Sequence, residues 1–426
     1  MQYLKKIDVR DVQIGMFIAQ LDRPWVETPF MYQGFELESQ TALDKLRELC
    51  RYIWIDTYKG ADYVPPARGG ADAYARMEQL EEEDKELKAR IMGLIAQSRA
   101  RANRKSYQDT ATFEEEIGQA REVEQHAREV TEETFHMARE GKKIDLNVAG
   151  RAVTRMVESI IRNPDALICL SQLKEVSNYT ALHSVRCCIL ALAFGRHLAL
   201  SRDELQVLGL GALLKDVGMV RVPQGILDKQ GNLSQEEFTT MQKHVRWGVE
   251  IIEESGNAPP GALEVVLQHH ERGDGSGYPD FRQGTGITPA GYIGAIVDVY
   301  DAVTSDRTYN VAMSAEDALK RMYEWREKDF SAHLVEEFIR CMGIFPIGSL
   351  VELSTGSVGV VITINRGRRL KPKVAMVLTA ARKPYSYRTV TDLMEHKDAF
   401  GKEIKISRVL PTGTFGINPM DHIVQL

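Results

Sequence analysis

Helical periodicity dominates the middle of this 426-residue chain, from residue 144 to residue 345. Apolar side chains recur there at the three- and four-residue intervals of an amphipathic helix. Serine followed three residues later by an acidic residue, a pattern that caps helix starts, occurs at residues 201–204, 234–237 and 314–317. These features predict an all-α core for the protein.

Both ends of the chain alternate apolar and polar residues with period two, which predicts β-strands. We expect residues 1–66 to form a small N-terminal α/β domain and residues 346–426 to form a small C-terminal β-rich domain. Residues 67–143 are dense in Glu, Lys, Arg, Gln and Ala and contain little Pro or Gly, so they predict a charged helical linker. The helical domain then covers residues 144–345.

Composition argues against several classes of protein. Hydrophobic residues make up 43% of the chain, but no uncharged apolar run approaches the ~18 residues that span a bilayer. The N-terminus contains no apolar signal core, so we expect a cytoplasmic protein without a membrane span. The five cysteines form no CxxC pair, which argues against a disulfide framework or a cysteine-based zinc site. The net charge of −6 argues against general binding of nucleic acid.

Histidine and aspartate residues recur beside apolar helical runs of the core, which would direct their side chains inward. Buried carboxylates and imidazoles cost free energy unless they are paired or bind a metal. Helical bundles hold metals through ligands that project inward from facing helices. A metal site is therefore one interpretation, and separately satisfied polar residues are the alternative. The residues concerned are His183, Asp216, His244, His269, His270 and Asp298.

The segment His269–Pro279 has the sequence HHERGDGSGYP. Its two adjacent imidazoles are suitable metal ligands, and the glycine-rich turn after them allows backbone amides to approach an anion closely. Taken alone, the histidine pair is also compatible with two partly exposed residues at a helix end. The segment thus indicates a site for a metal and a phosphate without establishing one.

Five blocks of sequence, in order along the helical region, resemble the HD-GYP family. This family is a branch of the HD phosphohydrolase superfamily that hydrolyses cyclic di-GMP at a metal centre. The resemblance implies an HD-type helical bundle, a divalent transition metal (iron or manganese, one or two ions), and hydrolysis to the linear dinucleotide or GMP. It also implies contacts with diguanylate cyclases through the loop around Gly277-Tyr278-Pro279. The blocks are YTALHS (179–184), LLKDVGM (213–219), MQKH (241–244), His269–Pro279 and VDVYDAVTSDR (297–307).

Carried over position by position, the resemblance assigns His183, Asp216 and Asp298 to one metal ion. It assigns the three remaining histidines, His244, His269 and His270, to a second ion, with Asp216 bridging the two. We expect Asp216 and Lys215 to take part in catalysis. The residues expected to contact the substrate are Lys243, Arg272, Asp274, Gly275, Gly277, Tyr278, Pro279 and Arg307. For Lys243 and Arg307, a solvated surface cation is the alternative.

Three departures from the family pattern put the reaction in doubt. The signature His-Asp doublet is Lys215-Asp216, a family lysine is replaced by Met219, and a family Pro-Tyr-Arg is Thr308-Tyr309-Asn310. A protonated ammonium cannot ligate a metal, and the pKa of a lysine is ordinarily ~10.4. Either Lys215 points to solvent beside a weakened metal site, or it replaces the first ion as a fixed positive charge. Its apolar flanks favour the second arrangement, with one metal left on His244, His269 and His270.

Three functions remain compatible with the sequence. The first is a cyclic di-GMP phosphodiesterase, or one for a related cyclic dinucleotide, with activity weakened by the loss of the signature histidine. The second is a catalytically inactive receptor for the nucleotide, or a protein-interaction module. The third is an HD phosphohydrolase for an ordinary nucleotide, which would not explain the segment His269–Pro279. The charged helices after Gly69 are also compatible with a homodimer.

Overall fold

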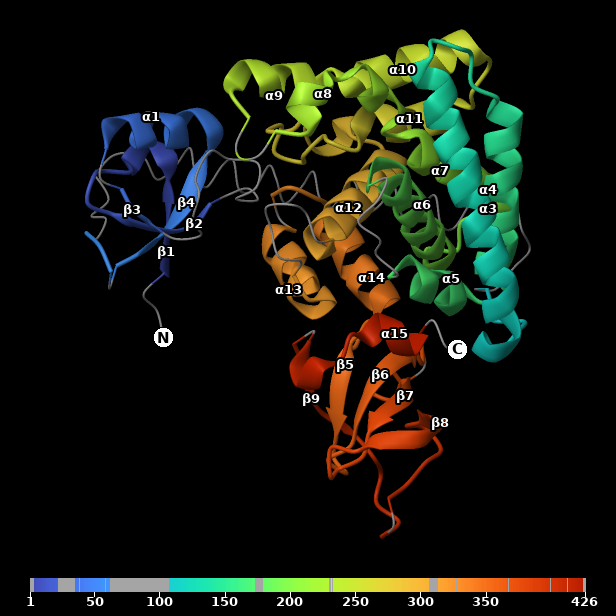
Figure 1. Ribbon diagram of the computed structural model, residues 1–426. Helices are drawn as coiled ribbons and strands as arrows, with labels where there is room; N and C mark the ends of the chain where they lie inside the picture. The colour runs from blue at the N-terminus through green and yellow to red at the C-terminus, as the bar shows by residue number, and fades with distance from the viewer. Residues whose placement is uncertain are drawn as a thin grey trace.

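Three structural units follow one another along the chain: a small α/β unit, a large helical unit and a small β unit (Figure 1). This sequence of fold classes confirms the prediction. Within the described part of the chain, no helix is both long enough and apolar enough to cross a membrane. The computed structural model describes residues 4–21, 35–37, 39–57, 59–61, 107–172, 179–229, 231, 233–305, 313–326, 328–366, 368–398, 400–411 and 413–423.

The N-terminal unit is a four-stranded antiparallel sheet covered by one helix. The strands β1 (Leu4–Asp8), β2 (Phe17–Leu21), β3 (Phe35–Glu36) and β4 (Tyr52–Asp56) are in the order β1-β4-β2-β3. Helix α1 (Gln40–Leu49) begins where the Ser39 hydroxyl accepts a hydrogen bond from the amide of Ala42. Its leucines pack against alternate apolar residues of the strands, which fixes the face of the sheet that becomes the core.

The helical unit contains all six histidine and aspartate residues that the sequence singled out. Its central helix, α6, is buried along most of its length and packs against helices α3, α4, α5, α7, α12 and α14. The helices are α3 (Phe113–Arg139), α4 (Leu146–Arg162), α5 (Pro164–Ser171), α6 (Tyr179–His197), α7 (Arg202–Leu214), α8 (Gln224–Leu227), α9 (Gln235–Gln242), α10 (His244–Ser255), α11 (Pro260–Gln268), α12 (Pro289–Thr304), α13 (Ala315–Trp325) and α14 (Ala332–Met342).

The predicted helix starts are found at α7, α9 and α13. Ser201 and Ser234 each accept a hydrogen bond from the amide three residues later, and the glutamate at that position bonds back to the serine amide. Ser314 accepts the amide of Asp317 in the same way. Each cap satisfies backbone donors that have no partner within the helix, so the serines determine where these helices begin.

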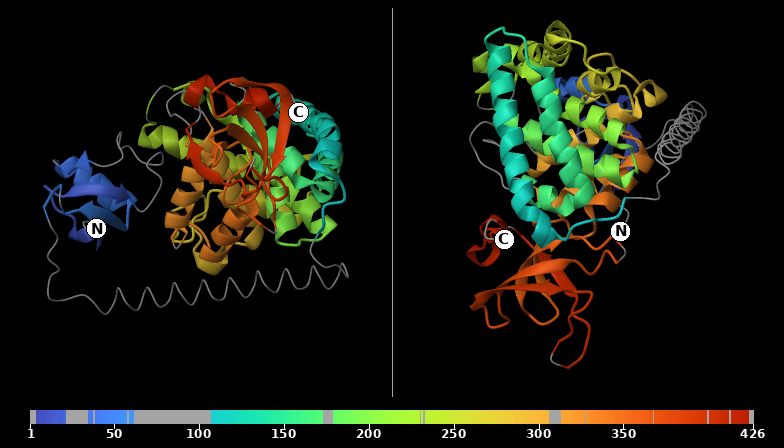
Figure 2. Two further views of the ribbon diagram at one scale, coloured as in Figure 1. Left: turned by 90° about the horizontal axis from the view of Figure 1, so that it is seen from below. Right: turned by 90° about the vertical axis from the view of Figure 1, so that its right-hand side faces the viewer.

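The structure corrects the prediction of a charged linker over residues 67–143. Residues 67–106 of this segment lie outside the described part of the chain, but α3 belongs to the core. One stripe of α3, including Phe113, Ala120 and Ala127, is buried against its neighbours, and Figure 2 shows α3 alongside α4. Small alanines in this stripe allow close packing of the helices, and they give a weaker apolar signal than leucine would. The abundant charged residues on the other faces therefore hid a core helix.

The C-terminal unit is a five-stranded antiparallel sheet in the order β8-β7-β6-β5-β9. Asp165, at the start of α5, joins this sheet to the helical unit. Its buried carboxylate accepts the amide of Ile364 at 2.8 Å and pairs with Arg366 at 2.5 Å. The strands are β5 (Leu350–Leu353), β6 (Val358–Thr363), β7 (Lys373–Leu378), β8 (Pro384–Asp392) and β9 (Ile406–Leu410), followed by the short helix α15 (Pro419–Ile423).

Candidate metal centre

The ends of several helices bring the six predicted residues together. His183 lies on α6 and Asp298 on α12, whereas Asp216 follows the end of α7 and His244 opens α10. His269 and His270 follow the end of α11 directly. Two overlapping groups of ligand atoms result, each with its atoms within 4.8 Å of one another. One group is Asp216, His244, His269 and His270, and the other is His183, Asp216 and Asp298.

A glycine permits the close approach of two of these helix ends. The short 3₁₀ turn Val217–Arg221 follows Asp216 and packs against the first turn of α10. A Cβ atom on Gly218 would lie 1.9 Å from the carbonyl oxygen of His244, so no other residue fits without moving the backbone. Gly218 thereby places Asp216 beside His244.

His244 and His269 are arranged as metal ligands. The Nδ1 atom of each lies 2.7 Å from a backbone carbonyl oxygen, of Met241 and Val266 respectively, and must donate because a carbonyl only accepts. Each Nε2 atom therefore presents a lone pair. Both Nε2 atoms are buried without a hydrogen-bond partner among the described residues, and they lie 3.7 and 3.6 Å from Asp216 Oδ1. Two such nitrogens facing a carboxylate fit a divalent transition metal.

Burial keeps the imidazoles of His244 and His270 neutral, as metal ligands must be. Burial lowers the pKa of His244 to about 4. Burial, with the neighbouring His269, lowers the pKa of His270 well below its usual value. The His270 ring is also stacked on Tyr278, with 4.6 Å between the ring centroids. At neutral pH these two imidazoles therefore offer lone pairs rather than positive charges.

The Lys215 side chain extends into the group formed by His183, Asp216 and Asp298, and it has no exposed surface. Its Nζ atom lies 2.6 Å from Asp298 Oδ1 and 2.9 Å from His183 Nε2, and it also donates to Asp216 Oδ2. An ammonium has three N–H groups, so all of its donors are used by these three acceptors. The inward position expected from the apolar flanks of Lys215 is therefore confirmed.

The ammonium and the two carboxylates hold one another in their charged forms. Burial alone would lower the pKa of Lys215, but Asp216 and Asp298 raise it well above its ordinary value. Burial likewise works against ionised Asp216 and Asp298, yet Lys215 holds the pKa of both carboxyls well below the usual range. The ion pairs offset the cost of burial, and the group stays ionised across the physiological pH range.

Behind His183 lies a second pair of charges that the sequence analysis missed. Asp301 accepts a hydrogen bond from His183 Nδ1 at 2.7 Å, and Arg186 Nε donates to the same carboxylate at 2.7 Å. The contact orients the His183 ring so that Nε2 points at Lys215. The signal was present in the sequence, because Asp301 follows Asp298 by one helical turn and Arg186 follows His183 by the same interval.

Glycines shape the segment that follows the paired histidines, here called the GYP loop (Glu271–Gly286). A Cβ atom on Gly277 would lie 2.4 Å from both the Arg272 amide nitrogen and the His270 carbonyl oxygen. Gly275 has a φ of +78°, in the left-handed region that favours glycine. These glycines fold the loop tightly back on itself, so that Tyr278 donates its amide to the His270 carbonyl.

The other residues expected to contact substrate differ in their surroundings. Arg272 is buried, and its guanidinium donates to the carbonyl oxygens of His269 and Glu271, so these contacts support the GYP loop from within. Asp274 is buried too and accepts the amide of Ser276. Lys243 is exposed beside His244, and Pro279 is half-buried. Arg307 lies outside the described residues, as do Thr308, Tyr309 and Asn310. The substrate-binding roles of these residues stay predictions.

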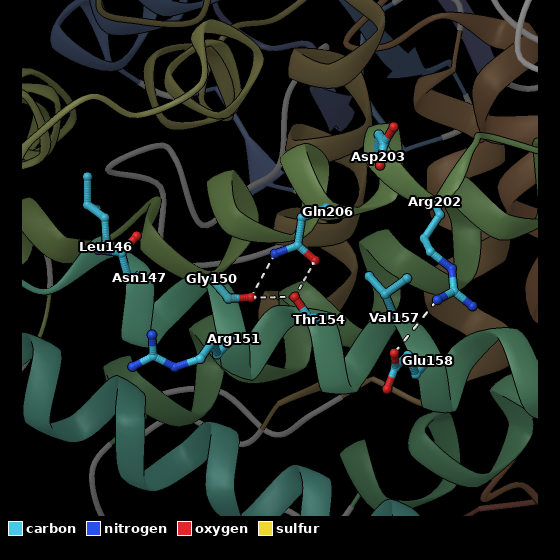
Figure 3. A pocket seen from close by; sticks show the side chains of 10 residues that line it. All are labelled: Leu146, Asn147, Gly150, Arg151, Thr154, Val157, Glu158, Arg202, Asp203 and Gln206. Atoms are coloured by element: carbon cyan, nitrogen blue, oxygen red, sulfur yellow. Dashed lines mark hydrogen bonds and ion pairs between the residues drawn. The ribbon is translucent and has the colours of Figure 1, made fainter.

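A cavity of about 480 Å³ lies between α4 and α7 and contains none of the histidine and aspartate ligands (Figure 3). Some of its polar groups bond to one another: the Gln206 side chain donates to the Gly150 backbone carbonyl, and the Thr154 hydroxyl donates to Gln206. Arg202 lies 3.7 Å from Glu158. Because none of the six histidine and aspartate residues lines this cavity, the candidate site remains the metal-ligand cluster.

Family models match each of the three structural units. A domain of unknown function (DUF3391) matches residues 4–149, and the HD domain matches residues 165–333. A KOW domain associated with the HD domain matches residues 350–406. The C-terminal β unit is thus of a kind already associated with HD domains.

Relatives cover both the whole chain and its central part. The cyclic di-GMP phosphodiesterase PA4108 of Pseudomonas aeruginosa is 34% identical over 392 residues, which are 92% of this chain and 89% of that protein. The response regulator RpfG of Xanthomonas campestris, also a cyclic di-GMP phosphodiesterase, is 38% identical over 34% of this chain and 38% of its own length. The 3'3'-cGAMP-specific phosphodiesterase 2 of Vibrio cholerae is 35% identical over 38% of this chain and 31% of its own length. With a relative of this similarity along almost its whole length, the chain belongs to the HD-GYP family of HD phosphohydrolases.

Proposed function

We propose that this protein is a metal-dependent phosphodiesterase that opens cyclic di-GMP, and that it holds one metal ion and a lysine where its family holds two metal ions. The observation that carries the proposal is the pair of buried Nε2 atoms on His244 and His269, which have no hydrogen-bond partner among the described residues and face Asp216. Cyclic di-GMP is proposed as substrate because the relative that matches almost the whole chain bears that name.

The proposed metal ligands are Asp216, His244, His269 and His270, whose ligand atoms lie within 4.8 Å of one another. A divalent ion there would supply positive charge to phosphoryl oxygens and would lower the pKa of a coordinated water. Burial keeps the imidazoles of His244 and His270 neutral, and Lys215 keeps Asp216 ionised. These residues therefore prepare the ligands before a metal binds.

Lys215 acts through its neighbours rather than on the substrate. Its side chain is fully enclosed, and its three N–H groups are used by Asp216, Asp298 and His183. It therefore has no donor left for a phosphate oxygen. We propose that Lys215 is a positioning residue, which fixes the orientation of Asp216 and supplies one positive charge where a metal would supply two.

This arrangement explains why we expect reduced activity rather than none. A second metal ion is worth several kcal/mol of transition-state stabilisation, and each ~1.4 kcal/mol changes the rate tenfold. Asp216 keeps Oδ1 toward His244 and His269 although Oδ2 accepts from Lys215. The remaining metal site is therefore complete, and slow hydrolysis is the expected result.

The direct test measures metal content and hydrolysis together. Protein loaded anaerobically with manganese or iron is expected to contain one ion per chain and to convert cyclic di-GMP to the linear dinucleotide, and a chelator is expected to stop the reaction. Binding of the nucleotide without any product, at every metal load, would show a receptor instead. Two ions per chain with rapid turnover would contradict the proposed role of Lys215.

Replacing His269 with alanine tests the proposed metal site. His269→Ala removes one of the two buried Nε2 lone pairs that would bind the metal. Metal affinity is therefore expected to fall by at least about a hundredfold, with hydrolysis lost in parallel. Metal content after desalting and the far-UV spectrum are measured on the same sample. His197→Ala is the matched control, because His197 pairs with Glu337 away from the site. Unchanged metal content in His269→Ala would move the ion to other ligands.

A further inference from the structure

Phe281, in the GYP loop, combines an exposed aromatic ring with an unfavourable backbone. Its φ is +56°, and its exposed fraction is 63%. The left-handed region crowds the Cβ atom of any residue other than glycine, and bulky residues there are rare. A large apolar side chain in water gains nothing that would offset this cost. Two features of Phe281 therefore need an explanation: what holds its backbone in the left-handed region, and what its exposed ring binds.

The cause lies in Glu271, which is fully buried and directly follows the paired histidines. One carboxylate oxygen accepts the amide of Asp280 at 2.7 Å, and the other accepts the amide of Arg282 at 2.9 Å. The two amides on either side of Phe281 are thereby bound to a single side chain. This double contact holds the backbone of Phe281 in the left-handed region.

Ion pairs further restrict the residues on either side of Phe281. The Asp280 carboxylate pairs with Arg246 on α10 and with Arg282 at 3.0 Å. The Gly284 amide donates to the Gly273 carbonyl, which joins the two ends of the loop. Phe281 thus projects from a rigid loop, so stacking on it would cost little side-chain or backbone entropy.

Phe281 lies close along the chain to the proposed metal site. It follows Tyr278 by three residues, so the two Cα atoms are at most roughly 11 Å apart. Tyr278 itself stacks on the proposed metal ligand His270. A cyclic dinucleotide whose phosphate lay at the metal would carry a purine base one ribose away from that phosphate. An exposed ring at this distance is placed to meet such a base.

We propose that Phe281 is a stacking platform for a guanine base of the cyclic dinucleotide. The inference rests on the function proposed above and adds to it a residue that binds the base rather than the phosphate. Stacking of a base on an aromatic side chain is independent of metal chemistry. Phe281 should therefore determine nucleotide affinity while leaving metal content unchanged.

The test compares Phe281→Gly, Phe281→Trp and a matched control. Phe415→Gly is the control because Phe415 also has a positive φ (+59°) and an exposed ring (51%), but belongs to the C-terminal unit. Binding of a hydrolysis-resistant phosphorothioate analogue of cyclic di-GMP is measured by calorimetry on metal-loaded full-length protein. Metal content and thermal midpoint are measured on the same samples.

For Phe281→Gly we expect affinity to fall about tenfold or more, from the loss of base stacking. Because glycine tolerates the left-handed region, its thermal midpoint should be no lower than that of the wild type. Phe281→Trp should bind nearly as well as wild type, and Phe415→Gly should bind equally well. Wild-type affinity in Phe281→Gly, or equal losses in both glycine variants, would overturn the inference alone. Failure of the wild type to bind the analogue would overturn the proposed function as well.

Discussion

Restoring the family residues at two positions, Lys215→His together with Met219→Lys, is expected to raise the metal content from one ion per chain to two. Removal of the ammonium frees Asp298, His183 and one oxygen of Asp216, and a histidine adds a neutral nitrogen to them. The rate of cyclic di-GMP hydrolysis should rise about a hundredfold or more, since the second ion is worth several kcal/mol. Metal analysis and steady-state hydrolysis give both quantities.

The control for this variant is Lys383→His. It makes the same lysine-to-histidine change at an exposed position of the C-terminal unit, away from the site. Metal content and rate should stay at wild-type values there. If the double variant gained activity without gaining metal, the added lysine at position 219 would be responsible. If neither quantity changed, Lys215 would not occupy a metal position.

Removing the charge of Lys215 without adding a ligand is expected to destabilise the fold strongly. Lys215→Met keeps a side chain of similar length but leaves Asp216 and Asp298 buried without their cation. Breaking a buried ion pair by removal of one partner costs about 3–5 kcal/mol. Urea denaturation of metal-free protein measures this difference in the free energy of unfolding, and Lys243→Met, at an exposed lysine, should change it by less than about 0.5 kcal/mol.

The effect of Lys215→Met should depend on pH in a defined direction. In the wild type, Lys215 holds the pKa of both carboxyls well below the usual range, so their contribution to stability is present above the unfolded pKa of about 4. Without the ammonium, burial dominates and raises these pKa values, so the carboxyls become neutral in mild acid. The deficit should therefore be largest near pH 7 and shrink toward pH 4. A deficit that is constant over this range would exclude the ion pairs as its cause.

The contacts of Lys215 indicate how a signature histidine can be replaced without collapse of the site. A metal ion and an ammonium differ in charge and in ligand number, yet both require acceptors directed at one point. The three acceptors Asp216, Asp298 and His183 satisfy the three protons of Lys215. This cluster of buried polar residues can therefore be stable without holding a second metal ion.

Most of the fold could be predicted from the sequence because its signals are local. The serine caps at positions 201, 234 and 314 determine helix starts, and the period of the apolar residues separates the helical unit from the two sheets. Helix α3 was predicted as part of a charged helical linker, and its place in the core was missed because its buried stripe includes alanines between charged faces. A stripe of this kind becomes a core element only when neighbouring helices cover it, which a single sequence does not show.

For the candidate site too, the sequence determined some features and the tertiary structure determined others. The sequence by itself singled out the six histidine and aspartate residues as candidate ligands, because buried imidazoles and carboxylates cost free energy unless they are paired or bind a metal. It also showed that Lys215 stands where the family has its signature histidine. Only the tertiary structure decided that the three protons of Lys215 meet three acceptors, that Arg186 and Asp301 support His183, and that Glu271 holds Phe281 outward. These contacts join residues that are up to 118 positions apart, and their distances depend on how the helices pack rather than on any local pattern.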